Sequence, residues 1–187
     1  MSEASSPTPA SDEAHSSHPS HLWVTWSDYH DLIDELALMV DRSGWQFDLI
    51  LCLARGGLRV GDQLSRIFDV PLAILATRSY RGGEGMERGA LDIAPAITLT
   101  QGAVAGRVLL VDDLVDSGVT LQQVKIHLNE HYPAVTSVRS AVLWHKAASC
   151  ETPDYAVRFL ENSPWIHQPF EIWDTMRPTD LARGSRD

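Results

Sequence analysis

Two hydrophobic periods alternate along the chain, and each predicts a different kind of secondary structure. Largely apolar runs, typical of strands buried on both faces of a sheet, occupy 47–53, 71–76 and 107–111. A further strand is expected at 135–143, and a shorter candidate lies at 97–100. Helical spacing, in which apolar residues recur every three or four positions, is found at 29–40, 58–68 and 121–128. We expect Ser27 to be the N-cap of the first helix and Ser43-Gly44 to end it.

Strands that alternate with helices favour an α/β domain with a doubly wound, mainly parallel sheet flanked by helices. This domain is expected to span 22–187. The segments at about 22–27 and 150–187 are less regular, and we expect them to form a small hood subdomain. Before it, the segment 1–21 is rich in Ser, Pro, Ala and His and predicts a disordered tail. A stretch rich in glycine and charge at 78–94 predicts a long mobile loop that can act as a lid.

The overall composition narrows the possible partners. The chain has 187 residues, 44% of them hydrophobic and 21% charged, which is ordinary for a soluble globular domain. A formal net charge of −10 argues against a protein that follows a nucleic-acid backbone by bulk electrostatics. No apolar stretch reaches transmembrane length, and the N-terminus lacks the pattern of a secretory signal. We therefore expect a cytoplasmic protein without a nucleic-acid partner or stable membrane insertion. Cys52 lies in an apolar strand pattern and predicts a buried free thiol.

The strongest chemical signal is a polar segment at the end of a predicted strand. It belongs to the run VLLVDDLVDSGVT at 108–120. Backbone N–H groups where the next helix begins, with the Ser117 and Thr120 hydroxyls, are expected to cradle an anion. Gly118 lets the chain approach that anion closely. Because Asp112 and Asp113 lie beside it, the segment suits a phosphate next to vicinal hydroxyls, as in a ribose 5-phosphate.

Three further segments carry candidate chemistry. Arg55-Gly56-Gly57 follows a predicted strand and opens a helix, so its N–H groups and guanidinium suit a pyrophosphate. Lys146 follows the predicted strand at 135–143, where an ammonium group can contact a carbonyl oxygen of a substrate. The segment PWIHQPF at 164–170 offers aromatic rings for stacking a planar base.

Each of these segments also has an ordinary structural interpretation. Asp116-Ser117-Gly118 fits a capped loop without a ligand, and Gly56-Gly57 fits a plain turn. Lys146 can be a solvated lysine at a strand end, and 164–170 a packed surface loop. Two adjacent carboxylates at the carboxyl end of a strand, where open α/β sheets bind ligands, favour a functional site.

The run at 108–120 resembles the phosphoribosyl-pyrophosphate-binding motif of the type I phosphoribosyltransferases, in which a hydrophobic strand precedes two acids and Asp-Thr/Ser-Gly-x-Thr. Within that family, the chain is most similar to the bacterial xanthine-guanine phosphoribosyltransferases. The shared features are VTW at 24–26, ARGGL at 54–58, SY at 79–80, DDLVD at 112–116, Lys146, PDY at 153–155 and WIHQP at 165–169. The resemblance covers roughly 22–173 and implies the type I phosphoribosyltransferase fold with its hood.

The resemblance also implies a reaction. The 5-phosphoribosyl group of phosphoribosyl pyrophosphate would be transferred to guanine, xanthine or hypoxanthine in purine salvage, with release of pyrophosphate. It implies Mg²⁺ as cofactor and a homodimer or homotetramer. Asp112 and Asp113 would hold the ribose hydroxyls, Asp113 also through Mg²⁺.

The other roles that the resemblance implies concern the two phosphate groups and the base. Pyrophosphate would be bound by Arg55, Gly56 and Gly57, and the 5-phosphate by Ser117, Gly118, Val119 and Thr120. Asp116 would be the catalytic base near purine N7, and Lys146 would contact the purine 6-oxygen. Trp165 would stack on the purine ring, while the Ile166 backbone would meet the edge of the base.

Two positions depart from the family pattern and leave the choice of base open. His167 stands where the family often has an acid, and Phe170 stands where a tryptophan is usual. Two alternative functions also remain: a phosphoribosyltransferase for another base, such as a pyrimidine, or a nucleotide-sensing regulator that binds without turnover. The acids, the Arg-Gly-Gly loop and Lys146 favour catalysis, because function is judged from the site rather than the fold.

Overall fold

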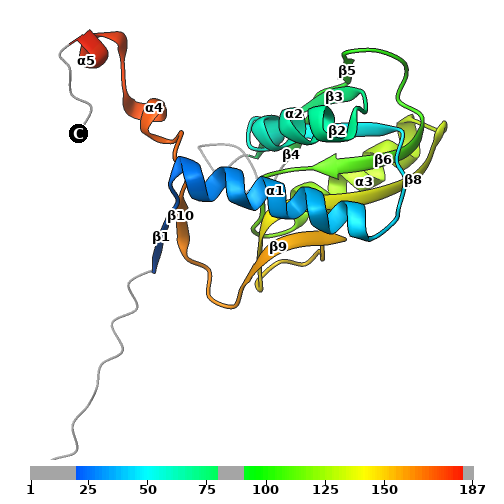
Figure 1. Ribbon diagram of the computed structural model, residues 1–187. Coiled ribbons are helices and arrows are strands. Elements are labelled where there is room, and N and C mark those ends of the chain that lie inside the picture. Colours follow the sequence, from blue (N-terminus) through cyan, green and yellow to red (C-terminus); the bar gives the residue numbers. More distant parts are fainter. Residues whose placement is uncertain (1–19, 80–90, 183–187) are drawn as a thin grey trace, which may run out of the picture.

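The computed structural model describes residues 20–79 and 91–182 and contains two sheets (Figure 1). The main sheet has eight strands: β2 (Leu49–Ala54), β3 (Leu72–Ser79), β4 (Leu91–Ile93), β5 (Thr98–Leu99), β6 (Gly106–Val111), β7 (Leu114–Val115), β8 (Val135–Lys146) and β9 (Tyr155–Leu160). The second sheet pairs β1 (His21–Trp23) with β10 (Trp165–His167). The helices are α1 (Trp26–Arg42), α2 (Gly57–Phe68), α3 (Val119–His131), α4 (Ile172–Thr175) and α5 (Pro178–Ala182).

The main sheet is doubly wound, which confirms the predicted fold class. Strand β2 is the parallel neighbour of both β3 and β6, and β6 is in turn parallel to β8. The chain thus leaves β2 through α2 in one direction, and leaves β6 through α3 in the other. The order of strands reverses between β2 and β6, so the loops after these two strands open at a topological switch point, where such sheets bind ligands.

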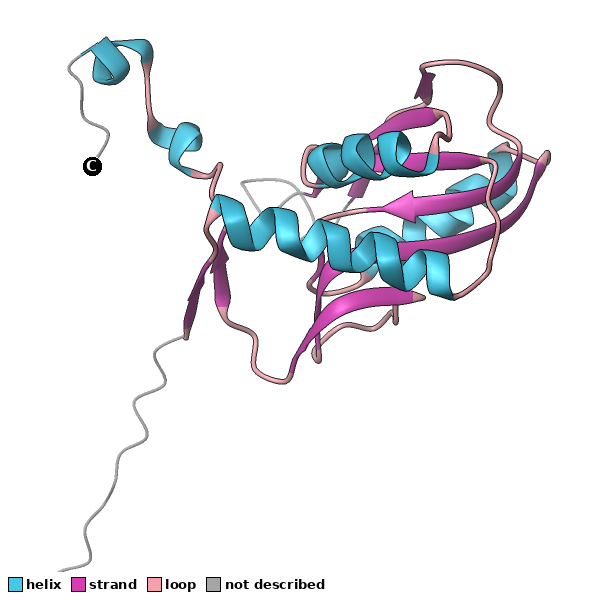
Figure 2. Ribbon diagram, viewed as in Figure 1, coloured by secondary structure: helices cyan, strands magenta, loops and turns pink. Residues whose placement is uncertain are grey.

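Helices cover both faces of the sheet (Figure 2). Because successive side chains of a strand point to opposite faces, the apolar run of β2 contributes to two separate cores. Ile50 and Cys52 pack with α1 and α2, whereas Leu49, Leu51 and Leu53 pack with α3. This burial on both faces explains why β2 reads as a continuous apolar run rather than as an alternating one.

The first helix begins earlier than the sequence pattern predicted. Thr25, not Ser27, is the N-cap: its hydroxyl accepts a hydrogen bond from the Asp28 N–H, at 3.2 Å. The Asp28 carboxylate accepts a hydrogen bond from the Thr25 N–H in return, at 3.0 Å. A capping box needs an acid or amide three residues after the cap, and Ser27 has His30 at that place. The predicted end of the helix is confirmed, with Ser43 as C-cap and Gly44 at φ +69°.

Two predicted irregular segments fall largely outside the described residues. Of the expected tail at 1–21, only Ser20 and His21 are described, and His21 begins β1. The two ends of the loop expected at 78–94 are strands instead, because β3 continues to Ser79 and pairs antiparallel with β4. Residues 80–90 lie outside the described part, so a lid there stays a prediction.

The hood is smaller than the sequence analysis expected. β1 and β10 form a parallel ribbon beside the start of α1, and α4 and α5 extend away from the main sheet (Figure 1). Strand β9, which lies within the predicted hood segment 150–187, instead pairs with β8 in the main sheet. Its Tyr155 and Val157 side chains are buried in the core beneath α1. Only these two residues of β9 are buried, which made its pattern too weak to recognise in the sequence.

The structure also bears on the predicted buried thiol and on membrane-spanning segments. Cys52 is a buried free thiol, as predicted, and burial raises its pKa to about 12. In the part of the chain that the structure describes, no helix is both long enough and apolar enough to span a bilayer.

Candidate active site

A cleft of about 790 Å³ opens at the switch point of the main sheet. The ends of β2 and β6 form its floor, because Cys52 pairs in register with Val111, where β6 ends, and β2 ends two residues later at Ala54. The loop after β2, the loop after β6 and a segment of the hood at 168–174 line its walls. Residues far apart in the sequence are thereby brought to one site.

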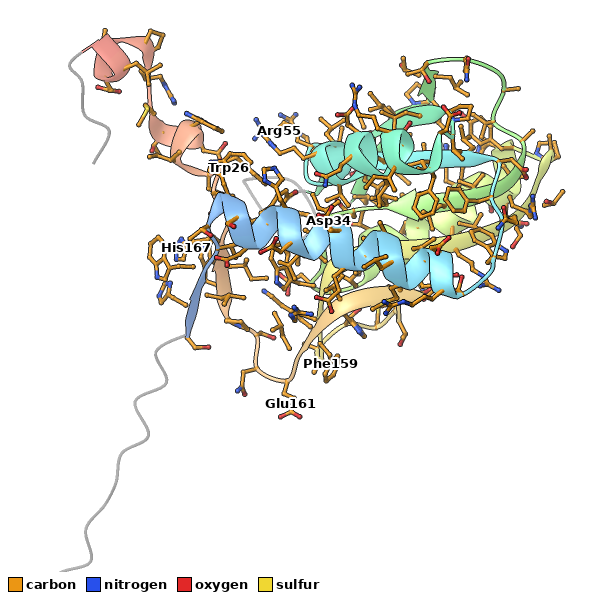
Figure 3. The ribbon with its side chains drawn as sticks, viewed as in Figure 1. Trp26, Asp34, Arg55, Phe159, Glu161 and His167 are labelled. Carbon is orange, nitrogen blue, oxygen red and sulfur yellow. The ribbon has the colours of Figure 1, made fainter. Side chains whose placement is uncertain are left out.

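The loop after β2 packs tightly against the end of β6. A Cβ atom on Gly57 would collide with the Val111 carbonyl oxygen, and one on Gly56 would collide with the Asp113 carboxylate. Only glycine allows this close approach, so Gly56 and Gly57 serve packing here as well as any ligand. Arg55 extends from the N-terminal end of α2, and its guanidinium lies 3.6 Å from the Asp174 carboxylate (Figure 3).

The two adjacent acids after β6 are held in different environments. Burial, followed by the negative charge of Asp113, raises the pKa of the Asp112 carboxyl well above its ordinary value. Asp112 accepts a hydrogen bond from the Asp113 N–H, at 3.0 Å. The Asp113 carboxylate accepts one from the Leu114 N–H at 2.8 Å and another from the Gln168 side-chain amide. Both carboxylates line the cleft with fixed orientations.

The loop between β7 and α3 is held by the chain that follows β8. The N-cap of α3 is Gly118, at φ +82°, and no side chain caps the helix. This differs from the capped loop that Asp116-Ser117-Gly118 also fitted in the sequence, although the Ser117 hydroxyl lies 3.4 Å from the Val119 N–H. The Ser117 carbonyl accepts a hydrogen bond from the Cys150 N–H at 2.9 Å. A Cβ atom on Gly118 would meet Ser149 and Glu151, so the loop has no room for a larger residue.

The acid Asp116 and the lysine Lys146 form an ion pair at the edge of the cleft. The Lys146 Nζ lies 3.3 Å from Asp116 Oδ1, and the lysine side chain is 10% exposed whereas that of Asp116 is 66% exposed. The sequence predicted that this strand ends at Leu143, but β8 continues to Lys146. It does so because β7 and β9 both pair with its last residues. This extension places the ammonium group beside the loop between β7 and α3.

Of the predicted site residues, eight line the cleft: Arg55, Gly56, Asp112, Asp113, Asp116, Ser117, Gly118 and Thr120. Gly57 and Val119 lie directly beside lining residues, and Lys146 reaches Asp116. The structure does not bring two of the predicted base-binding residues, Trp165 and Ile166, into this lining. Trp165 is 50% exposed, while Ile166 is buried in the core and paired with Leu22 of β1. Their roles in base binding stay predictions.

The sequence analysis missed several residues that line the cleft. Gln168 is buried and binds Asp113, and its Oε1 has no hydrogen-bond partner among the described residues. Arg59, Glu171 and Trp173 also line the cleft, and burial raises the pKa of Glu171. The motif WIHQP, quoted for the resemblance, contains Gln168 and could have drawn attention to it. The other three lie in no recognised motif, so only the folded chain places them here.

The fold and this cleft together define a phosphoribosyltransferase. The model of the phosphoribosyl transferase domain matches residues 25–174. The chain belongs to this family, and the resemblance noted from the sequence is confirmed. Its mainly parallel sheet with flanking helices is that of the type I members.

Named relatives are found among both sequences and solved structures. The chain is 29% identical over 152 residues to a xanthine-guanine phosphoribosyltransferase of Idiomarina loihiensis, covering 81% of this chain and 87% of that protein. It is 30% identical over 153 residues to the protein of that name from Gluconobacter oxydans, covering 81% and 83%. The crystal structure of a purine phosphoribosyltransferase from Pyrococcus horikoshii superposes with a TM-score of 0.66 at 29% identity, covering 81% of this chain and 94% of that one.

Proposed function

We propose that this protein is a purine phosphoribosyltransferase, which transfers the 5-phosphoribosyl group of phosphoribosyl pyrophosphate to a 6-oxopurine and releases pyrophosphate. One observation carries the proposal. Two adjacent acids, a glycine-walled loop with an arginine, and an Asp–Lys pair all surround one cleft at the switch point. The names of the relatives, which are xanthine-guanine and purine phosphoribosyltransferases, support a purine acceptor in a salvage reaction.

The donor would lie across the ends of β2 and β6. Its 5-phosphate would be bound by the N-terminal end of α3 and the loop that contains Ser117 and Gly118, where backbone N–H groups and the positive end of the helix favour an anion. Its ribose hydroxyls would be held by Asp112 and Asp113. Its pyrophosphate would then face the loop at Arg55, and the anomeric carbon would face Asp116.

A magnesium ion fits this cleft through Asp113. Each oxygen of that carboxylate accepts one hydrogen bond and keeps a lone pair for a cation. Residues 20–79 and 91–182 contain no group of three or more His, Cys, Asp or Glu that could hold a metal by themselves. Mg²⁺ is commonly bound by one or two carboxylates together with substrate oxygens, so the donor would complete its coordination. When bound, the ion would neutralise charge on the pyrophosphate.

The reaction is a substitution at the anomeric carbon of the donor. The bond from this carbon to the pyrophosphate oxygen breaks, and the pyrophosphate leaves with the electron pair. A bond from the same carbon to a purine nitrogen forms, and the proton of the purine is accepted by Asp116 as general base. The buried ammonium of Lys146, 3.3 Å from Asp116, would hold this carboxylate in place and contact the 6-oxygen of the base.

Formation of nucleotide from each base tests the proposal. With the donor and Mg²⁺, we expect product from guanine, xanthine or hypoxanthine, and no product when the metal is removed by a chelator. Product from a pyrimidine alone would favour a phosphoribosyltransferase for another base. Binding of nucleotide without turnover of any base would favour a regulator.

Trp165→Ala tests the stacking role that the resemblance implies for this residue. Because stacking of a base on an aromatic ring is worth about 1–3 kcal/mol, we expect the purine KM to rise about tenfold with the donor KM within about twofold. Trp173→Ala is the matched comparison, since Trp173 lines the cleft whereas Trp165 does not. A rise in the purine KM with Trp173→Ala only would contradict the role of Trp165.

Two further properties stay predictions. The resemblance to the family implies that this protein is a homodimer or homotetramer. Sedimentation of the purified protein can test this. The cytoplasmic location expected from the composition can be tested by fractionation of cells.

A further inference from the structure

The cleft has an excess of negative charge for a site that must bind a polyanion. Five carboxylates line it: Asp112, Asp113, Asp116, Glu171 and Asp174. The described residues provide two cations in the same lining, Arg55 and Arg59. Arg55 is already paired with Asp174, at 3.6 Å. Neither the motifs nor the resemblance assigns Arg59 a role.

Arg59 is held in place by an aromatic ring. Its guanidinium carbon lies 3.9 Å from the centre of the Phe170 ring, in the range of a cation–π contact. Phe170 is itself fixed by the edge of Tyr29, with ring centres 5.6 Å apart. Among the described residues, Arg59 forms no ion pair with a carboxylate. Its charge is therefore fixed by an apolar surface and is not neutralised by an acid.

Arg59 lies near the loop proposed to bind the pyrophosphate of the donor. It is the third residue of α2, so it lies within one turn of the Arg55-Gly56-Gly57 loop. The loop for the 5-phosphate lies at the start of a different helix, α3. A guanidinium with one face on an aromatic ring keeps its N–H groups, which lie in its plane, available for the oxygens of an anion.

We propose that Arg59, seated on Phe170, is a second pyrophosphate-binding cation of this enzyme. This inference rests on the proposed function, since it names a residue for the leaving group of that same reaction. It also gives a role to Phe170, one of the two departures from the family pattern.

Titration calorimetry with pyrophosphate and Mg²⁺ tests the proposal directly. We expect Arg59→Gln to raise the Kd for pyrophosphate about tenfold and Arg59→Lys to raise it less, because lysine keeps the charge but loses the planar fork. Ribose 5-phosphate, which lacks the pyrophosphate, is expected to bind Arg59→Gln within about twofold of the unaltered protein. Arg59 is exposed, so the variants are expected to fold, and thermal unfolding checks this.

The matched control is Arg66→Ala on the same helix, where Arg66 pairs with Asp62 at 3.1 Å and does not line the cleft. This control is expected to bind pyrophosphate as the unaltered protein does. Unchanged pyrophosphate binding by Arg59→Gln would overturn the proposal, and so would an equal loss of ribose 5-phosphate binding. The titration needs no turnover, so failure of the proposed reaction would be seen separately, as absence of product from the unaltered protein.

Discussion

Asp116→Asn is expected to lower kcat about 100-fold while the donor KM stays within about threefold. The substitution keeps the shape of the side chain but removes the proton acceptor, and general base catalysis commonly contributes about 10²–10⁴ in rate. The side chain is 66% exposed and an asparagine oxygen can still accept a hydrogen bond from Lys146, so we expect the melting temperature to change little. Steady-state kinetics and thermal unfolding provide the measurement.

Asp62→Asn is the control for removal of a carboxylate elsewhere. Asp62 is also exposed and also paired with a cation, Arg66 at 3.1 Å, but it does not line the cleft. The kcat of the Asp62→Asn variant is expected to equal that of the unaltered protein. A normally folded Asp116→Asn variant with full turnover would remove this residue from the mechanism.

Gly118→Ala is expected to raise the donor KM at least tenfold and to lower stability by about 2 kcal/mol. A left-handed backbone costs a residue with a Cβ about 1–2 kcal/mol. At φ +82° this Cβ would in addition meet the Ser149 hydroxyl and the Glu151 backbone N–H, so the phosphate loop would have to move. For a chain of this size, such a loss lowers the melting temperature by roughly 4–8 °C.

Gly44→Ala separates backbone strain from displacement of the loop. Gly44 also has a positive φ, +69°, but a Cβ there would have nothing within 4 Å, and it lies at the end of α1. We expect this control to lose about 1 kcal/mol of stability with the donor KM unchanged. If both variants changed the melting temperature and the donor KM to the same extent, the fit of Gly118 against the loop at 149–151 would not matter for binding.

The fold could be predicted where burial gives a strong pattern. Strand β2 and the last four residues of β6 are apolar because both of their faces are covered, and α1 and α2 each bury one regular side. Strand β9 has only two buried residues, so its apolar pattern in the sequence is weak. The pairing with β8 that fixes this strand is a long-range contact, which a local pattern does not show. The N-cap of α1 is Thr25 and not the predicted Ser27, because reciprocal hydrogen bonds between Thr25 and Asp28 fix the start of the helix.

The site could be predicted where its residues lie in one short segment. The acids and the loop proposed to bind the 5-phosphate share the run 108–120, so the sequence alone identified them together. Arg59 and Gln168 were missed because each reaches the cleft through tertiary contacts, with Phe170 and with Asp113 respectively. No local pattern in the sequence records such contacts.

A crystal structure of the protein with phosphoribosyl pyrophosphate and Mg²⁺ tests the central claim most directly. We expect the 5-phosphate at the loop of Ser117 and Gly118, the ribose hydroxyls on Asp112 and Asp113, and the pyrophosphate beside α2. A donor bound elsewhere on the protein, or a cleft without density for it at saturating concentration, would contradict the account.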